Sequence, residues 1–308
     1  MRSFLKNEKG MVPVQNWEPK CWINIEIPTE AEKDYLINEL LIPEAFYNDI
    51  EDVDERPRIE IEDGWYLIII RVPYKSSDEK VPYSTVPLGL IFKDDFFISV
   101  CFYKTDLISD FVVYSQRKNI IKENNFDMVL KLLLSSSVWY LKYLKQINLN
   151  IKLAELQLEK SIKNEELQRL LLIEKCLVIF TTSLKGNDIL SHRIKTIKDY
   201  KDSFDPELVE DVEIELRQAQ ETTKIYSDIL SGMMDAYASV ISNNLNMIMK
   251  QLTLISIMLM IPTLIASFFG MNVPNKIENS SYAFIGIVFI SFILSMVGFI
   301  WFRRKKWF

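Results

Sequence analysis

Two long hydrophobic runs lie near the C-terminal end of this 308-residue sequence. Residues 251–275 and residues 279–302 contain no Asp, Glu, Lys, Arg or His. Each run is at least as long as the roughly 20 residues with which a helix crosses a ~30 Å hydrocarbon core. Core helices of soluble proteins usually carry charges on one side, so the pattern favours two transmembrane helices over a pair of buried helices.

The first 122 residues combine strand and helix patterns and predict an α/β domain. Period-two alternation or β-branched runs predict strands, and apolar residues three and four apart predict helices between them. The predicted strands are residues 21–27, 65–72, 87–92 and 96–102, the last two forming a hairpin, and the predicted helices are residues 30–40 and 43–51.

Long amphipathic patterns follow in residues 123–204. Residues 126–162 and 165–184 predict two helices that pack on the α/β domain and on a stalk. The stalk begins at Asp205-Pro206, a good N-cap and first-turn pair. The next proline is Pro262, so we expect one stalk helix within residues 205–272 that continues into the first hydrophobic run. About 64 residues from Pro206 at 1.5 Å each give a length of roughly 95 Å. Gly232 and Pro262 are the positions where it could bend.

The distribution of charge predicts how the chain crosses the membrane and which partners it binds. The last 58 residues hold five of the 36 basic and one of the 42 acidic residues, so they carry +4 and the first 250 carry −10. Four basic residues (303–306) follow the second hydrophobic run, whereas the loop of residues 273–281 has only Lys276 and Glu278. By the positive-inside rule, the tail of residues 303–308 and the N-terminal part are cytoplasmic, with residues 282–302 as the second span. We expect a multi-pass protein of the inner or plasma membrane that binds no nucleic acid, because its soluble part is acidic.

Catalytic chemistry is poorly supported. The three cysteines are widely spaced, and His192 is the single histidine, which argues against a disulfide framework and a histidine-based metal site. No nucleophile, base and orienting group occur together, so we do not expect an enzyme.

The first hydrophobic run carries a stripe of small or polar residues at helical spacing. Alone, such a stripe could be a packing seam between helices. Two spans cannot enclose water, so a conduit requires a homo-oligomer with closed cyclic symmetry. The stripe consists of Asn246, Met249, Leu252 or Thr253, Ser256, Met260, Thr263, Ser267 and Gly270.

Gly270-Met271-Asn272 closes this run. At this position the tripeptide resembles the signature of the CorA family of magnesium channels. Residues 249–253, Met-Lys-Gln-Leu-Thr, are similar to the family's membrane entry, Pro262 falls at its mid-helix proline, and the basic tail matches. The resemblance is strong over the last ~100 residues and looser before them, through Asp49-Ile50 and residues 56–58.

The resemblance implies an α+β membrane protein: an N-terminal cytoplasmic α/β domain, a long helical stalk, two C-terminal transmembrane helices and a homopentameric funnel. It implies Mg²⁺ influx down the electrochemical gradient and a regulatory Mg²⁺ between Asp49 and Asp211 of neighbouring subunits. The selectivity filter would be Gly270, Met271 and Asn272, and the pore lining Asn246, Met249, Leu252, Ser256, Met260, Thr263 and Ser267.

Two alternatives remain open. Lys276 offsets Glu278 near the outer mouth, so the preference among Mg²⁺, Co²⁺, Ni²⁺ and Zn²⁺ is undetermined. From another class, a membrane-tethered sensor or scaffold would use the two spans only as anchors. That interpretation makes the polar stripe a packing seam and Asn272 dispensable.

Overall fold

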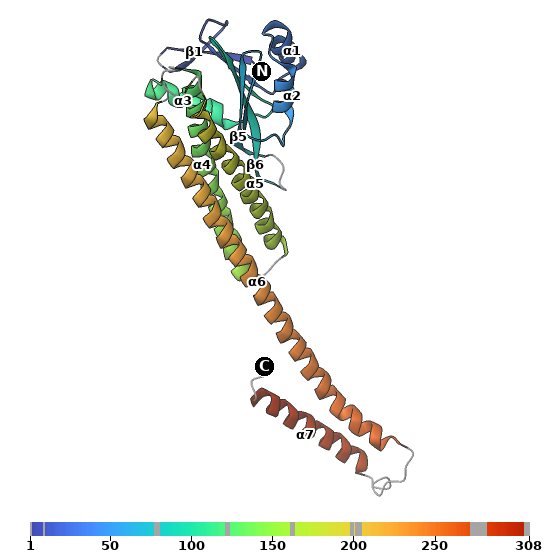
Figure 1. The fold of residues 1–308 in the computed structure, drawn as a ribbon. Helices are drawn as coiled ribbons and strands as arrows, with labels where there is room; N and C mark the ends of the chain where they lie inside the picture. Colours follow the sequence, from blue (N-terminus) through green and yellow to red (C-terminus); the bar gives the residue numbers. More distant parts are fainter. Residues whose placement is uncertain are drawn as a thin grey trace. The chain divides into compact units, whose positions relative to one another are not determined.

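The computed structural model describes residues 2–8, 10–76, 81–120, 124–160, 164–197, 200, 205–271 and 282–304. The chain forms two compact units, Met1–Gly232 and Met233–Phe308. The division between them falls within one helix, α6 (Pro206–Phe269), and the second unit also contains α7 (Ala283–Arg304) (Figure 1).

A seven-stranded sheet organises the first unit. The strand order is β2-β1-β3-β7-β6-β5-β4, and neighbouring strands are antiparallel except for the parallel pair β3 and β7. The strands are β1 (Arg2–Asn7), β2 (Met11–Val14), β3 (Trp22–Glu26), β4 (Arg58–Glu62), β5 (Trp65–Lys75), β6 (Tyr83–Lys93) and β7 (Phe96–Cys101).

One face of the sheet packs against η1 (Tyr35–Glu39) and α2 (Glu44–Glu51), whereas α1 (Glu30–Asp34), which leads into η1, buries none of its residues. Because successive side chains of a strand point to opposite faces, Leu67 and Ile69 share this core with Phe46 and Ile50 of α2. Gly89 of β6 allows α2 to come close: a Cβ there would lie 2.1 Å from Cδ1 of Ile50.

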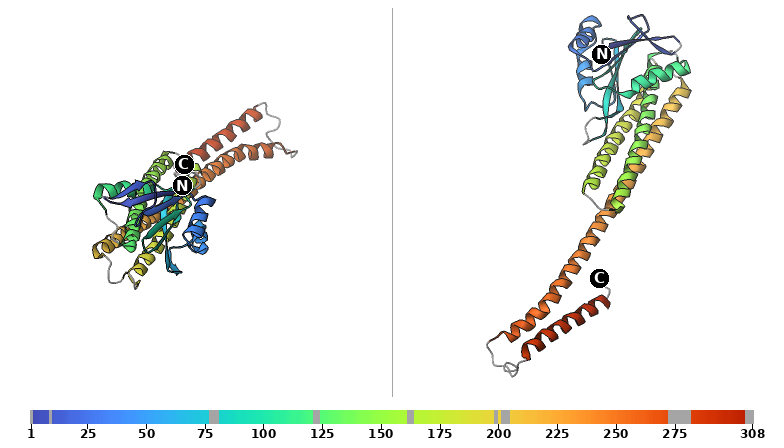
Figure 2. Two further views of the ribbon diagram at one scale, coloured as in Figure 1. Left: turned by 90° about the horizontal axis from the view of Figure 1, so that it is seen from above. Right: turned by 180° about the vertical axis from the view of Figure 1, so that it is seen from behind.

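The opposite face is covered by α3 (Asp106–Lys118), α4 (Asn125–Lys160) and α5 (Asn164–Ile194) (Figures 1 and 2). Trp22 meets Phe111 of α3 edge-on at 5.8 Å between ring centroids. Phe92 meets Phe126 of α4 at 5.0 Å. The sheet therefore separates α2 from the helices α3, α4 and α5.

Helix α6 starts as its N-terminal residues predict. The side chain of Asp205 accepts hydrogen bonds from the backbone N–H groups of Glu207 (3.0 Å) and Leu208 (3.4 Å), which caps the helix. In the first unit, α6 is tied to α5 through Gln220, whose side chain donates to the carbonyl of Leu184 at 3.2 Å.

The predicted α/β domain, the long helix and the pair of apolar helices are confirmed. The sequence patterns missed β1, β2, β4 and α3, and α5 runs to Ile194 rather than to residue 184. Of the three missed strands, β2 and β4 form the edges of the sheet and β1 lies next to β2. They bury few side chains: Leu5 is the buried residue of β1, Met11 is that of β2, and β4 has none. Weak burial gives weak alternation, so no pattern marked them.

We expect Gly89→Val to destabilise the first unit, because the added side chain must displace Ile50, which is fully buried. Overpacking of this kind costs about 1–3 kcal/mol. Gly232→Ala is the control, since a Cβ at Gly232 meets nothing within 4 Å, and alanine favours a helix. Thermal denaturation followed by circular dichroism should show a lower Tm for Gly89→Val alone; equal Tm values for the two variants would contradict the close approach of α2.

Candidate functional site

Helices α6 and α7 have the length and composition of membrane spans. Each contains an 18-residue window of high mean hydropathy, 2.2 in α6 and 2.5 in α7, and only 6% of each window is buried within the chain. A core helix of a soluble protein would be mostly buried. The large apolar surface left exposed is the kind that lipid covers.

One face of α6 packs against α7. Leu254 is 1% exposed. The Ser295 hydroxyl of α7 donates to the carbonyl of Met258 at 3.4 Å, and a Cβ at Gly298 would lie 3.7 Å from Cδ1 of Ile261. Residues 254, 258 and 261 are four and three apart, so they form one face of the helix.

Pro262 explains the contact at Met258. Proline has no N–H and cannot donate to the carbonyl four residues earlier, which is that of Met258. An unpaired carbonyl in hydrocarbon is costly. The Ser295 hydroxyl supplies the missing donor from the neighbouring helix, so the sequence of α7 compensates for the proline in α6.

The predicted pore-lining residues lie on the other side of α6. At 100° per residue, the centre of the stripe is roughly 160° from the centre of the face that contacts α7. Every predicted residue of the stripe is exposed within the single chain, with Met249 at 60% and Met260 at 65%. The exposed members are Asn246, Met249, Leu252, Ser256, Met260, Thr263, Ser267 and Gly270.

Two hydroxyl groups of this stripe donate to carbonyls of their own helix. Ser256 donates to the carbonyl of Leu252 at 2.9 Å, and Thr263 donates to that of Leu259 at 2.8 Å. With the hydrogen used in this way, the hydroxyl oxygen remains available as an acceptor. At these two positions the stripe therefore presents oxygen acceptors whose own donors are paired.

The end of α6 is described as far as Met271, which is 56% exposed. The backbone N–H of Gly270 still donates to Ala266 at 2.9 Å. Asn272, the predicted outer loop of residues 273–281 and residues 305–308 of the basic tail lie outside the described residues. The position of Asn272 in the selectivity filter therefore stays a prediction.

Asp49, the first predicted regulatory residue, lies on α2 beside Arg58 of β4. Arg58 forms ion pairs with three carboxylates: Asp49, Glu55 at 2.6 Å and Glu60 at 3.1 Å. Burial disfavours the ionised guanidinium, but Asp49 and Glu55 outweigh it, so the pKa of Arg58 lies above its ordinary value. Asp49 already has a cationic partner in the isolated chain.

A second arginine, Arg71, holds the backbone of the acidic segment between α2 and β4. Arg71 donates to the carbonyls of Val53 and Glu55, the latter at 3.2 Å, and burial lowers its pKa. Asn187 of α5 fixes the Arg71 backbone, accepting from its N–H at 2.9 Å and donating to its carbonyl at 2.8 Å. The acidic segment after α2 is thereby attached to β5 and α5.

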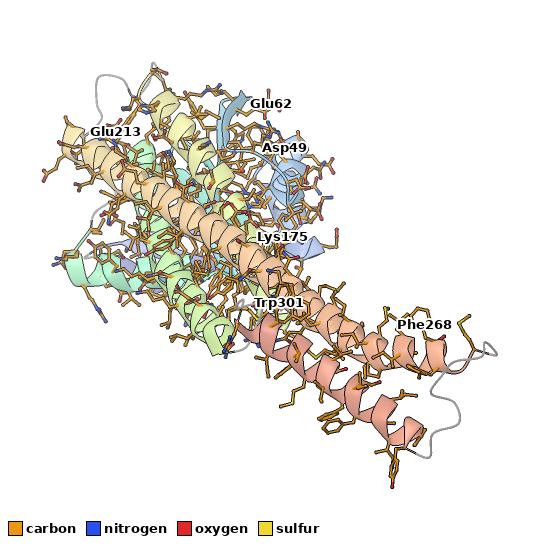
Figure 3. The ribbon with its side chains drawn as sticks, turned by 90° about the horizontal axis from the view of Figure 1, so that it is seen from below. Asp49, Glu62, Lys175, Glu213, Phe268 and Trp301 are labelled. Carbon is orange, nitrogen blue, oxygen red and sulfur yellow. The ribbon has the colours of Figure 1, made fainter. Side chains whose placement is uncertain are left out.

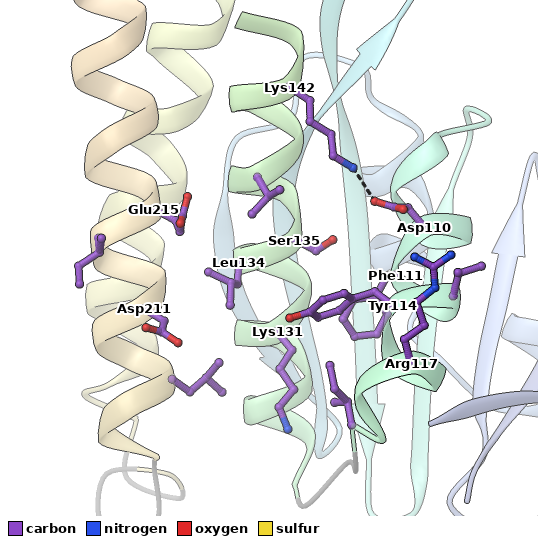
Figure 4. Close-up of a pocket in the computed structure, with 15 residues that line it drawn as sticks. Asp110, Phe111, Tyr114, Arg117, Lys131, Leu134, Ser135, Lys142, Asp211 and Glu215 are labelled. Carbon is purple, nitrogen blue, oxygen red and sulfur yellow. Dashed lines mark hydrogen bonds and ion pairs between the residues drawn. The ribbon is translucent and has the colours of Figure 1, made fainter. Parts of the chain in front are cut away.

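Asp211, the second predicted regulatory residue, lines a groove between α3, α4 and α6 of about 570 Å³ (Figure 4). Its carboxylate and that of Glu215 project from α6 toward α4. Across the groove, Lys142 of α4 pairs with Asp110 of α3 at 2.7 Å. Asp211 is exposed and forms no ion pair in the part of the chain that the structure describes.

The sheet keeps Asp49 and Asp211 apart in one chain. Asp49 belongs to α2 on one face, whereas the groove around Asp211 belongs to α3, α4 and α6 on the other. Figure 3 shows the separation through Asp49 and Glu213, a neighbour of Asp211. An ion bound by both aspartates would therefore need two copies of the chain.

Among the described residues, no three His, Cys, Asp or Glu side chains are grouped so that they could hold a metal ion. The sequence patterns did not single out Arg58, Arg71, Asn187 or Ser295. Isolated polar residues in strands and helices carry no periodic signal, and the interactions that define them span up to 116 residues of sequence. Arg58 was noted only as part of the residues 56–58 that carry the family resemblance.

The fold and the two apolar helices define a membrane protein with a large extramembrane unit. The sequence profile of the family "CorA-like Mg2+ transporter protein" matches residues 18–304. The chain therefore belongs to this family.

Individual proteins agree with this assignment. The Cobalt/magnesium transport protein CorA of Methanocaldococcus jannaschii is 24% identical over 93% of this chain and 90% of its own. The protein of that name from Thermotoga maritima is 24% identical over 97% of this chain and 86% of its own. A solved structure of the CorA magnesium transporter from Methanocaldococcus jannaschii matches with a TM-score of 0.84 at 21% identity, covering 100% of this chain and 99% of that one. The structural match shows that the fold is shared along the full length.

We expect Ser295→Ala to weaken the pairing of α6 and α7, because the Met258 carbonyl loses its donor. Hydrogen bonds between transmembrane helices contribute about 0.6 kcal/mol on average and up to about 1.7 kcal/mol. Ser291→Ala is the matched control, since the Ser291 hydroxyl donates to Ile287 of its own helix. Thermal unfolding in detergent should show the larger loss for Ser295→Ala, and Pro262→Ala should reduce that loss by restoring an N–H. Equal effects of Ser295→Ala with and without proline would contradict the compensation.

Proposed function

We propose that the protein carries Mg²⁺ across the membrane as a homopentameric channel whose lumen is lined by α6. The carrying observation is that the polar stripe faces away from α7, so copies of α6 can present it to a shared axis. Membership in the family supports magnesium as the cargo. A single α6–α7 pair cannot enclose water, and a closed ring of copies can.

Asn272 forms the outer selectivity ring in this proposal, and Gly270 and Met271 shape the helix end that presents it. Mg²⁺ releases its water ligands reluctantly. A ring of neutral amide oxygens can hydrogen-bond the hydrated ion without removing its waters and without holding it as tightly as carboxylates would. Further in, Met249, Leu252 and Met260 form hydrophobic constrictions that stop ions by dewetting when they are narrow.

The direction of transport follows from charge. In this proposal the protein lies in the inner or plasma membrane with both termini in the cytoplasm, because the basic residues 303–306 follow the second span. An inside-negative potential of 100 mV then contributes roughly 4.6 kcal/mol to the entry of one divalent ion. Influx needs no other energy source. Co²⁺ is a second cargo in this proposal, since both curated relatives are named cobalt/magnesium transport proteins. Ni²⁺ and Zn²⁺ are the alternative cargoes.

Cytoplasmic Mg²⁺ closes the channel in this proposal by bridging Asp49 of one subunit and Asp211 of the next. The two residues lie on opposite faces of the sheet in one chain, which suits a site shared between subunits. Carboxylate oxygens are suitable ligands for Mg²⁺. When the ion leaves, the like charges repel and the subunits separate.

Asn272→Ala should lower the initial rate of Mg²⁺ uptake into proteoliposomes by about tenfold or more, because the amide ring that admits the hydrated ion is lost. Asn244→Ala is the matched control, since Asn244 is exposed on α6 away from the stripe. Size-exclusion chromatography should show that both variants assemble like the wild type. Unchanged uptake by Asn272→Ala would exclude the ring and favour a sensor or scaffold.

Cysteines at Ser256 and Thr263 should react with a hydrophilic, membrane-impermeant thiol reagent at least about tenfold faster than a cysteine at Ile255, because water lines the stripe. Ile255 is 52% exposed in the single chain but lies off the stripe, so it should face lipid. The native cysteines are buried and add little background. Equal reactivity at the three positions would mean that the stripe does not face a lumen.

Asp49→Ala combined with Asp211→Ala should abolish closure by cytoplasmic Mg²⁺ while uptake at low Mg²⁺ persists. The pair Glu51→Ala and Glu210→Ala removes the same charge from neighbouring exposed positions and should leave closure intact. Uptake and protease resistance across a Mg²⁺ titration measure the effect. Normal closure in the Asp49/Asp211 variant would contradict the regulatory site.

A further inference from the structure

We infer that Arg58 is a built-in competitor of the regulatory divalent cation: its guanidinium occupies Asp49 when the ion is absent and so sets the Mg²⁺ concentration at which the protein responds. This inference rests on the regulatory site of the proposed function. It assigns to a residue outside that site the role of tuning its affinity.

The geometry places Arg58 where the ion would bind. Asp49 has one ion-pair partner among the described residues, and it is Arg58. Both side chains are about two-thirds buried, with exposed fractions of 33% for Arg58 and 27% for Asp49. A divalent ion that takes an oxygen of Asp49 must therefore displace or share this contact.

The charges around Arg58 favour exchange over permanent pairing. One guanidinium faces three carboxylates, those of Asp49, Glu55 and Glu60, so the group carries a net charge of −2, which one divalent ion would balance. Arg58 keeps Glu55 and Glu60 as partners when Asp49 is released. The arginine can stay in place while Asp49 changes partner.

The guanidinium is also incompletely satisfied. Its Nε is buried and has no acceptor within the described ranges. A cation that filled a purely structural place would be expected to use its donors more fully. The backbone of the segment does not depend on Arg58, because Arg71 holds the carbonyls of Val53 and Glu55.

Competition and a purely structural role predict opposite changes in the response to Mg²⁺ when Arg58 is removed. If Arg58 only supported Asp49, its removal would weaken the response to Mg²⁺. If it competes, its removal leaves Asp49 free for the ion and strengthens the response. Ion pairs that remain partly exposed contribute modestly, so we expect the midpoint Mg²⁺ concentration to change by roughly three- to tenfold.

The test uses the full-length protein in detergent, with MgCl₂ as the probe. Arg58→Gln should lower the Mg²⁺ midpoint for protease resistance and for the rise in Tm by roughly three- to tenfold. Arg58→Lys, which keeps the charge but not the branched contacts, should fall between Arg58→Gln and the wild type and guards against misfolding of Arg58→Gln. The matched control is Arg56→Gln: it removes the same charge two residues away, and Arg56 is exposed with no ion pair in the described chain.

Each possible result of this test supports or overturns the inference. A lower midpoint for Arg58→Gln but not for Arg56→Gln supports competition, and adding Asp49→Asn should remove the gain. An unchanged or higher midpoint for Arg58→Gln, beside a normal wild-type response, overturns the inference and leaves the regulatory site standing. A wild type that does not respond to Mg²⁺ but still transports it overturns the regulatory site and this inference together, and leaves transport standing.

Discussion

Polar groups inside hydrocarbon must be paired, and this constraint shapes the membrane part of the chain. Pro262 removes a donor from α6, and Ser295 of α7 restores one at the Met258 carbonyl. The hydroxyls of Ser256 and Thr263 are satisfied by their own helix. With these groups paired, α7 can cover one face of α6 and leave the polar stripe on the other. The proposed lumen depends on this division of faces.

A second constraint acts in the first unit, where many carboxylates share one short segment. Two arginines hold it in different ways: Arg58 binds side-chain carboxylates, and Arg71 binds backbone carbonyls. The segment can therefore keep its shape while its charges change partners. Such a separation of shape from charge is what an ion-responsive segment requires.

The sheet of the first unit separates the two aspartates. Because it lies between α2 and the helices α3 and α4, Asp49 and Asp211 face different surroundings in one chain. The proposed regulatory site and the proposed lumen then both require assembly into a ring. Both proposals therefore depend on the same oligomer.

The sequence alone determined the features that depend on local periodicity and composition. The uncharged runs predicted two spans, Asp205-Pro206 predicted the start of α6, and helical spacing predicted the stripe from Asn246 to Ser267. These signals repeat every few residues, so no distant contact is needed to read them. The weakly buried strands β1, β2 and β4 gave no such signal.

Tertiary structure decided which polar residues matter and what they contact. The link between Arg71 and Asn187 joins positions 116 residues apart, and Ser295 meets Met258 across 37 residues. Single polar residues of this kind look alike along a sequence, because their partners are fixed by how strands and helices pack. The direction of the stripe relative to α7 was likewise unknown until the two helices were placed together, since periodicity defines a face of a helix but not its neighbour.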